Sequence, residues 1–237
     1  MKFIFSSPRK YVQGAGVLDE LGSYVTELGT QAFVVADDVV WGLIGERAQA
    51  TLTKAGVNVV RQQFNGEASS NEITRLSQQA QQQNCNVVIG LGGGKTLDTV
   101  KAVADEIQQP VVIVPTIAST DAPCSALSVI YSDSGVFESY RFYNKNPDLV
   151  LVDTAVCAAA PARLFASGIA DGLATWVEAQ AVARSHAKSM VNGDPTIAGL
   201  AIARACEETL LTWGYSAYVA VSEKRVTPAV EAVVEAN

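Results

Sequence analysis

The sequence predicts an α/β fold in which a parallel sheet forms a nucleotide-binding domain, followed by the beginning of an all-helical domain. Two observations predict it. Short apolar runs alternate with helical patterns over the first 150 residues, as strands and helices do in such folds. From Pro161 onward the strand-like runs stop and only helical patterns remain. We therefore expect an α/β domain over residues 1–160 and the first helices of an incomplete α-helical domain over residues 161–237.

Five apolar runs are the expected strands of the sheet. Each has four or five residues and is apolar throughout rather than alternating. Strands that helices cover on both faces have this pattern, and they belong to parallel sheets. The runs are Ala32–Ala36, Val57–Val60, Val87–Gly90, Val111–Val114 and Leu149–Val152.

Two helices are expected between these strands. Asn71–Gln83 carries an apolar stripe at helical spacing, and Ser69 with Glu72 forms a possible capping box before it. Thr96–Ile107 is the second helix, which ends before Pro110.

A hairpin and three further helices complete the expected elements. Ser132–Gly135 has the composition of a turn between the runs Ser128–Tyr131 and Val136–Tyr143. The helices are expected over Pro161–Ala187, Thr196–Tyr218 and Thr227–Glu235.

The composition argues against several partners. The net charge is −7, which disfavours nucleic acid and anionic membrane surfaces. No apolar stretch approaches the roughly 20 residues that span a bilayer. The four cysteines form no Cys-x-x-Cys pair and indicate reduced thiols of a cytoplasmic protein. Charged residues make up only 17%, below the roughly 25% usual for soluble chains, which favours a homo-oligomer.

Three successive glycines, Gly92, Gly93 and Gly94, connect an apolar strand to a helix. Backbone N–H groups in such a turn can hold phosphates in front of the helix N-terminus. A P-loop would need glycine at Ile89, and a dinucleotide fingerprint starting at Gly90 would need glycine at Lys95. Neither motif is matched. The alternative to a phosphate-binding loop is a tight turn without a ligand.

Asp37 follows the first expected strand. A carboxylate at that end of a parallel strand can bind the ribose hydroxyls of NAD and would repel the 2′-phosphate of NADP. Here the acid precedes the glycine loop, so the topology must differ from the common Rossmann order. A helix N-cap is the alternative, and the adjacent Asp38 could substitute.

Two further regions could carry chemistry. The loop Pro115–Ser125 is rich in hydroxyls, contains Asp121, and leaves the carboxyl edge of the sheet, where α/β proteins bind ligands. Asp171 lies among small and apolar residues of an expected helix. It needs a partner there, either a metal ion or a backbone group.

The chain resembles the bacterial glycerol dehydrogenases of the metal-dependent, iron-type (group III) alcohol dehydrogenase family. The likeness covers nearly the whole chain, and the stretch 115–131 is its most specific part. The glycine loop alone is shared with related alcohol dehydrogenases and dehydroquinate synthases. The matching stretches are residues 7–14, 92–99, 115–131 and 161–164, together with Asp171 and residues 174–176.

The resemblance implies NAD-dependent oxidation of glycerol, or a related small polyol, to dihydroxyacetone or its counterpart. Asp37 would hold the adenosine ribose, and Asp121 would bind substrate hydroxyls. Asp171 would be one of three ligands of a zinc ion, beside two histidines, and the metal would lower the pKa of the substrate hydroxyl. The remaining cofactor-binding residues would be Gly92, Gly93, Gly94, Lys95, Thr96, Leu97, Asp98, Thr116, Ile117, Ala118, Ser119, Ser125, Leu127 and Tyr131.

The sequence departs from the family in its metal ligands. His186 is the only histidine and matches neither ligand position, so we expect a C-terminally truncated chain with an incomplete zinc site. Two alternatives stay open. One is an NAD-binding fragment without turnover. The other is a related metal-dependent alcohol dehydrogenase or a dehydroquinate synthase-like enzyme.

Overall fold

The computed structural model describes residues 1–237, which form two compact units. The sheet unit comprises Ser7–Thr116 and Ala122–Asp153. The helical unit comprises Met1–Ser6, Ile117–Asp121 and Thr154–Asn237. Each unit is therefore assembled from separate stretches of the chain.

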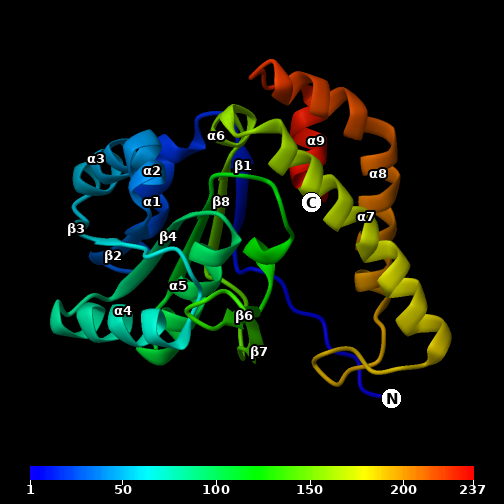
Figure 1. The fold of residues 1–237 in the computed structure, drawn as a ribbon, viewed down its shortest axis with the longest axis horizontal. Coiled ribbons are helices and arrows are strands. Elements are labelled where there is room, and N and C mark those ends of the chain that lie inside the picture. The colour runs from blue at the N-terminus through cyan, green and yellow to red at the C-terminus, as the bar shows by residue number, and fades with distance from the viewer. The chain divides into compact units, whose positions relative to one another are not determined.

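The sheet unit is built on six parallel strands (Figure 1), which confirms the predicted fold class. Their order across the sheet is β1-β8-β5-β4-β2-β3. The sequence patterns predicted five of them and missed β1, a short strand at one edge. The strands are β1 (Tyr11–Gly14), β2 (Gln31–Ala36), β3 (Asn58–Gln63), β4 (Val87–Gly92), β5 (Val111–Pro115) and β8 (Leu149–Asp153).

Burial separates the central strands from the edges. All residues of β4, β5 and β8 are buried, as the uninterrupted apolar runs predict. The expectation of a fully buried strand is wrong for β3, which begins after Val57 and contains only exposed and half-buried residues. It lies at the other edge of the sheet, beside β2 only, and so one of its sides has no neighbouring strand.

Helices cover the sheet on both faces. In the sheet unit, α1 packs on α3, and α4 packs on α5. The connection from β2 to β3 and the connection from β3 back to β4 run in opposite directions across the sheet, so right-handed crossovers place α3 and α4 on opposite faces (Figure 1). The helical segments are η1 (Val17–Glu20), α1 (Leu21–Val25), α2 (Asp38–Val40), η2 (Trp41–Gly45), α3 (Glu46–Lys54), α4 (Ser70–Gln82), α5 (Gly94–Glu106) and η3 (Ala122–Cys124).

The expected capping box of α4 forms only in part. The Ser69 hydroxyl accepts a hydrogen bond from the backbone N–H of Glu72, as predicted. The Glu72 carboxylate, however, accepts hydrogen bonds from Asn65 and forms an ion pair with Arg75. A guanidinium three residues away provides a stronger partner than the N–H of the cap residue.

The predicted hairpin forms a separate two-stranded antiparallel sheet of β6 (Leu127–Tyr131) and β7 (Phe137–Phe142). Its turn is closed by a hydrogen bond of 2.8 Å from the N–H of Gly135 to the carbonyl of Ser132. Asp133 in this turn accepts hydrogen bonds from Ser69 at 2.5 Å and Asn71 at 2.6 Å. The hairpin tip is thereby attached to the start of α4.

The helical unit contains α6 (Thr154–Ala159), α7 (Ala162–Ser185), α8 (Ile197–Ser222) and α9 (Pro228–Ala236). The last three confirm the predicted helices. Thr196 and Thr227 cap α8 and α9, each accepting a hydrogen bond from a backbone N–H three residues later. α8 packs against both α7 and α9. None of the helices has the length and hydropathy of a membrane-spanning segment.

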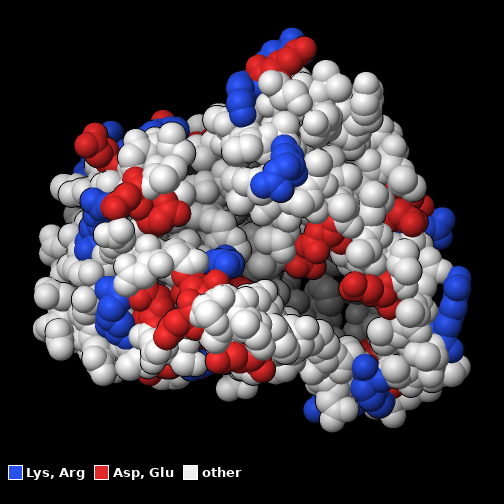
Figure 2. Space-filling model, viewed as in Figure 1, with Lys and Arg blue, Asp and Glu red and all other residues white.

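Uncharged residues occupy most of the face drawn in Figure 2, and the charged side chains on it are of both signs. This appearance agrees with the low content of charged residues. The four cysteines are free thiols, and Cys85, Cys157 and Cys206 are buried.

Candidate cofactor and substrate site

The carboxyl ends of β2 and β4 form a topological switch point. β2 and β4 are neighbours, and the strands that follow them in the chain, β3 and β5, lie on opposite sides of the pair. The register pairs Val35 with Gly90, so two residues further on Asp37 is level with Gly92. Ligands of open α/β sheets bind at such a crevice. Asp37 follows β2 and the glycine loop follows β4, so the acid precedes the loop in the chain, unlike in the common Rossmann order.

Asp37 is the N-cap of α2. Its Oδ1 accepts a hydrogen bond of 2.7 Å from the N–H of Val40. The capping role that the sequence left open is therefore present, while the role toward a ribose stays a prediction. Asp38 is exposed and holds Arg61 and Gln63 at 2.6 and 2.9 Å. The two neighbouring carboxylates thus have different tasks.

Gly90, Gly92 and Gly93, at the end of β4 and in the loop after it, also differ in role. A Cβ on Gly92 would lie 2.7 Å from Oγ1 of Thr96, and Gly92 has a φ of +156°. A Cβ on Gly90 would lie 2.5 Å from Cγ2 of Val100. These two glycines are needed because α5 packs closely on β4. Gly93 is the N-cap of α5.

The N-terminus of α5 can accept an anion. Gly93 has no side chain to cap this helix of 13 residues, and no side-chain hydrogen bond caps it. The first N–H groups of a helix have no partner within the helix, and its dipole favours negative charge there. A phosphate group fits this arrangement.

The first two turns of α5 carry five of the predicted cofactor residues, Gly94 to Asp98. Lys95 is exposed, forms an ion pair of 2.6 Å with Glu67, and lies over the ring of Tyr131. Thr96 and Leu97 are buried in the unit, so their side chains serve packing and only their backbone remains for a ligand. Thr116 follows β5, and its N–H donates to the carbonyl of Gly92 at 3.0 Å.

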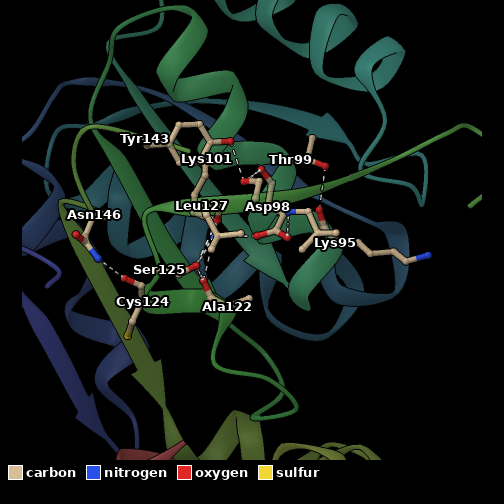
Figure 3. A network of polar contacts seen from close by, with 12 residues as sticks. Lys95, Asp98, Thr99, Lys101, Ala122, Cys124, Ser125, Leu127, Tyr143 and Asn146 are labelled. Atoms are coloured by element: carbon tan, nitrogen blue, oxygen red, sulfur yellow. Dashed lines mark hydrogen bonds and ion pairs between the residues drawn. The ribbon is translucent and has the colours of Figure 1, made fainter. Parts of the chain in front are cut away.

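Asp98 points into the protein. It is 6% exposed, forms an ion pair of 2.8 Å with Lys101, and accepts a hydrogen bond of 2.9 Å from the N–H of Val129. Its carboxylate is thereby occupied by internal contacts (Figure 3).

Lys101 is a residue that the sequence patterns missed. Its ammonium group also donates to the carbonyls of Ala122 and Leu127 and to the hydroxyl of Ser125 (Figure 3). The network joins two predicted cofactor residues, Ser125 and Leu127, to α5. A lysine flanked by Val100, Ala102 and Val103 was the signal that could have revealed it, because a buried ammonium needs several acceptors.

In the helical unit, α7 holds the loop that contains Ile117, Ala118, Ser119 and Asp121. The N–H of Asp121 donates a hydrogen bond of 3.0 Å to Oδ2 of Asp171. One turn earlier, a Cβ on Gly168 would lie 2.2 Å from the carbonyl oxygen of Ala118. The backbone of the loop therefore rests directly on the helix.

The donors of this chain do not make up a metal site. No group of three or more His, Cys, Asp or Glu side chains is arranged to hold a metal ion. Asp171 is exposed, and a backbone N–H is its partner, one of the two alternatives that the sequence left open. His186 ends α7 with a left-handed backbone, φ 54°.

The model of the iron-containing alcohol dehydrogenase family matches residues 8–154. The chain belongs to this family. The match includes the glycine loop, the loop after β5 and the hairpin, so the contacts described above for the sheet unit are those of a family member. This confirms the resemblance seen in the sequence.

Sequence matches to named relatives extend over nearly the whole chain. A glycerol dehydrogenase of Pseudomonas putida is 52% identical over 231 residues, covering 98% of this chain and 63% of its own. A glycolaldehyde reductase of Halobacterium salinarum is 50% identical over 237 residues, covering 100% and 65%. A crystal structure of a probable glycerol dehydrogenase from Sinorhizobium meliloti has a TM-score of 0.93 at 42% identity, covering 100% and 65%. The chain thus spans a little under two thirds of these relatives.

Proposed function

We propose that the sheet unit binds NAD and that the protein is an NAD-dependent oxidoreductase that converts glycerol, or a related small polyol, to dihydroxyacetone or its counterpart. The observation that carries the proposal is the pairing of Asp37 with the open N-terminus of α5 across the switch point between β2 and β4. A carboxylate and an anion site on neighbouring strands match the ribose and the pyrophosphate of an ADP moiety. The relatives named glycerol dehydrogenase support the choice of substrate.

In this proposal each part of NAD has its own residues. Asp37 accepts hydrogen bonds from the adenosine ribose, and the N–H groups of Gly94, Lys95 and Thr96 bind the pyrophosphate. NAD, when bound, supplies the acceptor of the hydride. The residues that would line the rest of the cofactor are Thr116, Ile117, Ala118, Ser119, Ser125, Leu127 and Tyr131, and Asp121 would bind substrate hydroxyls.

Zinc is assigned no step in this proposal. Asp171 is the one residue that the resemblance offers as a ligand, whereas catalytic zinc has about three protein ligands. We therefore expect the 237-residue chain to bind zinc weakly and to turn over glycerol slowly or not at all. Equilibrium dialysis against zinc, beside an assay of NADH formation, measures both. Stoichiometric zinc together with rapid turnover would show a site built from other donors.

A second candidate function is NAD binding without turnover. It is favoured by the absence of a metal-holding cluster among the side chains of this chain. Calorimetry with NAD, followed by assays of NADH formation with glycerol and of NADH consumption with glycolaldehyde, separates the candidates. Binding with turnover supports an oxidoreductase, and the preferred substrate decides between the activities for which the relatives are named. Binding without turnover supports the second candidate, and no binding contradicts both.

We also propose that the protein forms a homo-oligomer and binds neither nucleic acid nor membranes. Large apolar side chains on α8 support self-association, since Ile197 is 90% exposed, Leu211 70% and Tyr215 82%. Sedimentation over a range of concentrations tests the oligomer.

A further inference from the structure

Lys101 is a buried cation in the middle of α5. The residue is 3% exposed, and its ammonium group has four oxygen partners within the sheet unit. They are Oδ1 of Asp98 at 2.8 Å, the carbonyl of Ala122 at 3.0 Å, the hydroxyl of Ser125 at 3.2 Å and the carbonyl of Leu127. One side chain thereby attaches three segments to each other: α5, η3 with the loop after it, and the first residue of β6 (Figure 3).

A second set of contacts holds the same segments. Asp98 accepts from the N–H of Val129, and the hydroxyl of Ser128 donates to the carbonyl of Asp98 at 2.8 Å. Tyr143 donates to that hydroxyl at 2.8 Å. The start of β6 is thus aligned with α5 residue by residue. Of the two α5 side chains in the network, Asp98 and Lys101, it is Lys101 that also contacts Ala122 and Ser125.

Stability alone gives a poor account of this arrangement. Removing an ammonium group and a carboxylate from water is costly, and an apolar pair of similar volume often stabilises a protein equally well. An apolar side chain, however, could not bring two carbonyls and a hydroxyl to one point. The Ser125 hydroxyl also donates to the carbonyls of Ala122 and Leu127 at 3.1 and 3.3 Å. The ammonium group that donates to the same three oxygens therefore helps to hold the conformation of the loop 122–127.

The loop lies toward one end of the proposed cofactor cleft. Along the sheet, β2 carries Asp37, β4 carries the glycine loop and β5 comes next. η3 contacts α5 and β5, which places it on the side of the glycine loop away from β2. With the adenosine at Asp37 and the pyrophosphate at α5, the loop borders the nicotinamide half.

We infer that Lys101 is a positioning residue for the nicotinamide half of the cofactor cleft, acting through Ser125 and Leu127 without touching NAD itself. This inference rests on the proposed function. It distinguishes two parts of one cleft: the ADP half depends on the sheet and the α5 N-terminus, and the nicotinamide half depends on the Lys101 contacts.

The test compares NAD with ADP as calorimetric ligands of the full chain. Lys101→Met keeps the length of the side chain and removes the charge. We expect it to weaken NAD binding about tenfold, the effect of losing hydrogen bonds to a charged group, and to change ADP binding less than about twofold. The change in NADH fluorescence on binding, which reports on the nicotinamide environment, should fall as well.

Two further variants are needed. Arg141→Met is the matched control, because Arg141 also ties the hairpin to α5, through Asp105 and Glu106 at 2.9 Å each, but does not contact the loop. It should leave both affinities unchanged. The pair Lys101→Met with Asp98→Asn removes both buried charges, so it tests the loss of the anchor without an unpaired carboxylate. It should show the same selective loss of NAD.

The outcomes are distinct. Unchanged NAD affinity in the double variant would overturn the inference, as would equal losses of NAD and ADP or an equal loss in Arg141→Met. Unfolding of both Lys101 variants would also contradict it, since Lys101 would then serve folding as a whole. If the unmodified chain binds ADP and NAD, and the variants keep the same ratio of NAD affinity to ADP affinity, only this inference fails. If it binds neither, the proposed function fails too.

Discussion

The backbone N–H of Asp121 donates a hydrogen bond of 3.0 Å to the carboxylate of Asp171, fifty residues further along the chain. The resemblance gives these residues separate roles, toward substrate and metal. The structure adds that one positions the other within the helical unit. Gly168 lies one turn before Asp171 on the same face of α7, and its missing side chain leaves room for the carbonyl of Ala118.

Replacement of Gly168 by alanine should destabilise the chain. The new Cβ would lie 2.2 Å from the carbonyl oxygen of Ala118, so the loop or the helix must move, at a cost of about 1–3 kcal/mol. Gly214→Ala is the control, because a Cβ there would meet Ile169 at 3.5 Å, an ordinary contact. That variant should gain about 0.5–1 kcal/mol from its helix propensity. Urea unfolding measures both, and equal stabilities would contradict the close approach.

Asp37→Ser should relax the preference for NAD over NADP by about 1–3 kcal/mol, because the charge that opposes a 2′-phosphate is lost. Serine is also a good N-cap, so α2 keeps the hydrogen bond that Asp37 provides to Val40. Asp38→Ser removes a neighbouring charge that is paired with Arg61 and should leave the preference unchanged. Titration with both cofactors measures the effect. Equal affinity of the unmodified chain for NAD and NADP would refute the role of Asp37.

Gly93→Val should abolish most NAD binding while the fold is retained. Gly93 is the N-cap of α5, and a branched side chain there would occupy the space in which a phosphate meets the N–H groups. Gly42→Val adds the same side chain where a Cβ meets nothing within 4 Å and should bind NAD normally. Circular dichroism checks the fold and calorimetry the binding. Undiminished binding by Gly93→Val would show that the glycine loop is only a turn.

Alkaline pH should destabilise the sheet unit through Cys85. Burial raises the pKa of this thiol to about 11, from an ordinary value of 9.0. Between these values the unfolded chain releases the proton first, so the free energy of unfolding falls as pH rises and is unaffected below pH 9.0. We expect a loss of about 1–2 kcal/mol across this window.

Cys85→Ala isolates this contribution. Burial also raises the pKa of Tyr143, but that effect is the same in the unmodified protein and in the variant. Urea midpoints measured below and above the window should therefore fall less in the variant. An equal fall of the urea midpoint in the unmodified protein and in Cys85→Ala would contradict the assignment to Cys85.

Local signals determined much of the fold. The apolar runs at residues 87–90 and 111–114 predicted the buried centre of the sheet, because helices on both faces leave no exposed side for polar residues. Thr196 and Thr227 marked helix starts through bonds that span only three residues. The successive glycines likewise predicted a turn and the start of α5 after it. These elements could be predicted because the residues that cause them lie only a few positions apart in the sequence.

Tertiary packing decided what these signals could not. Edge strand β1 is held by β8, which lies far away in the sequence. The carboxylate of Asp98, which the resemblance assigns to the cofactor, accepts a hydrogen bond from the N–H of Val129, 31 residues further along the chain, and that of Asp171 accepts one from the N–H of Asp121. A buried polar group must find a partner, but the sequence does not say which of many distant groups will be within reach. Only the packing of α5 on β6, and of α7 on the loop that contains Asp121, brings those partners together.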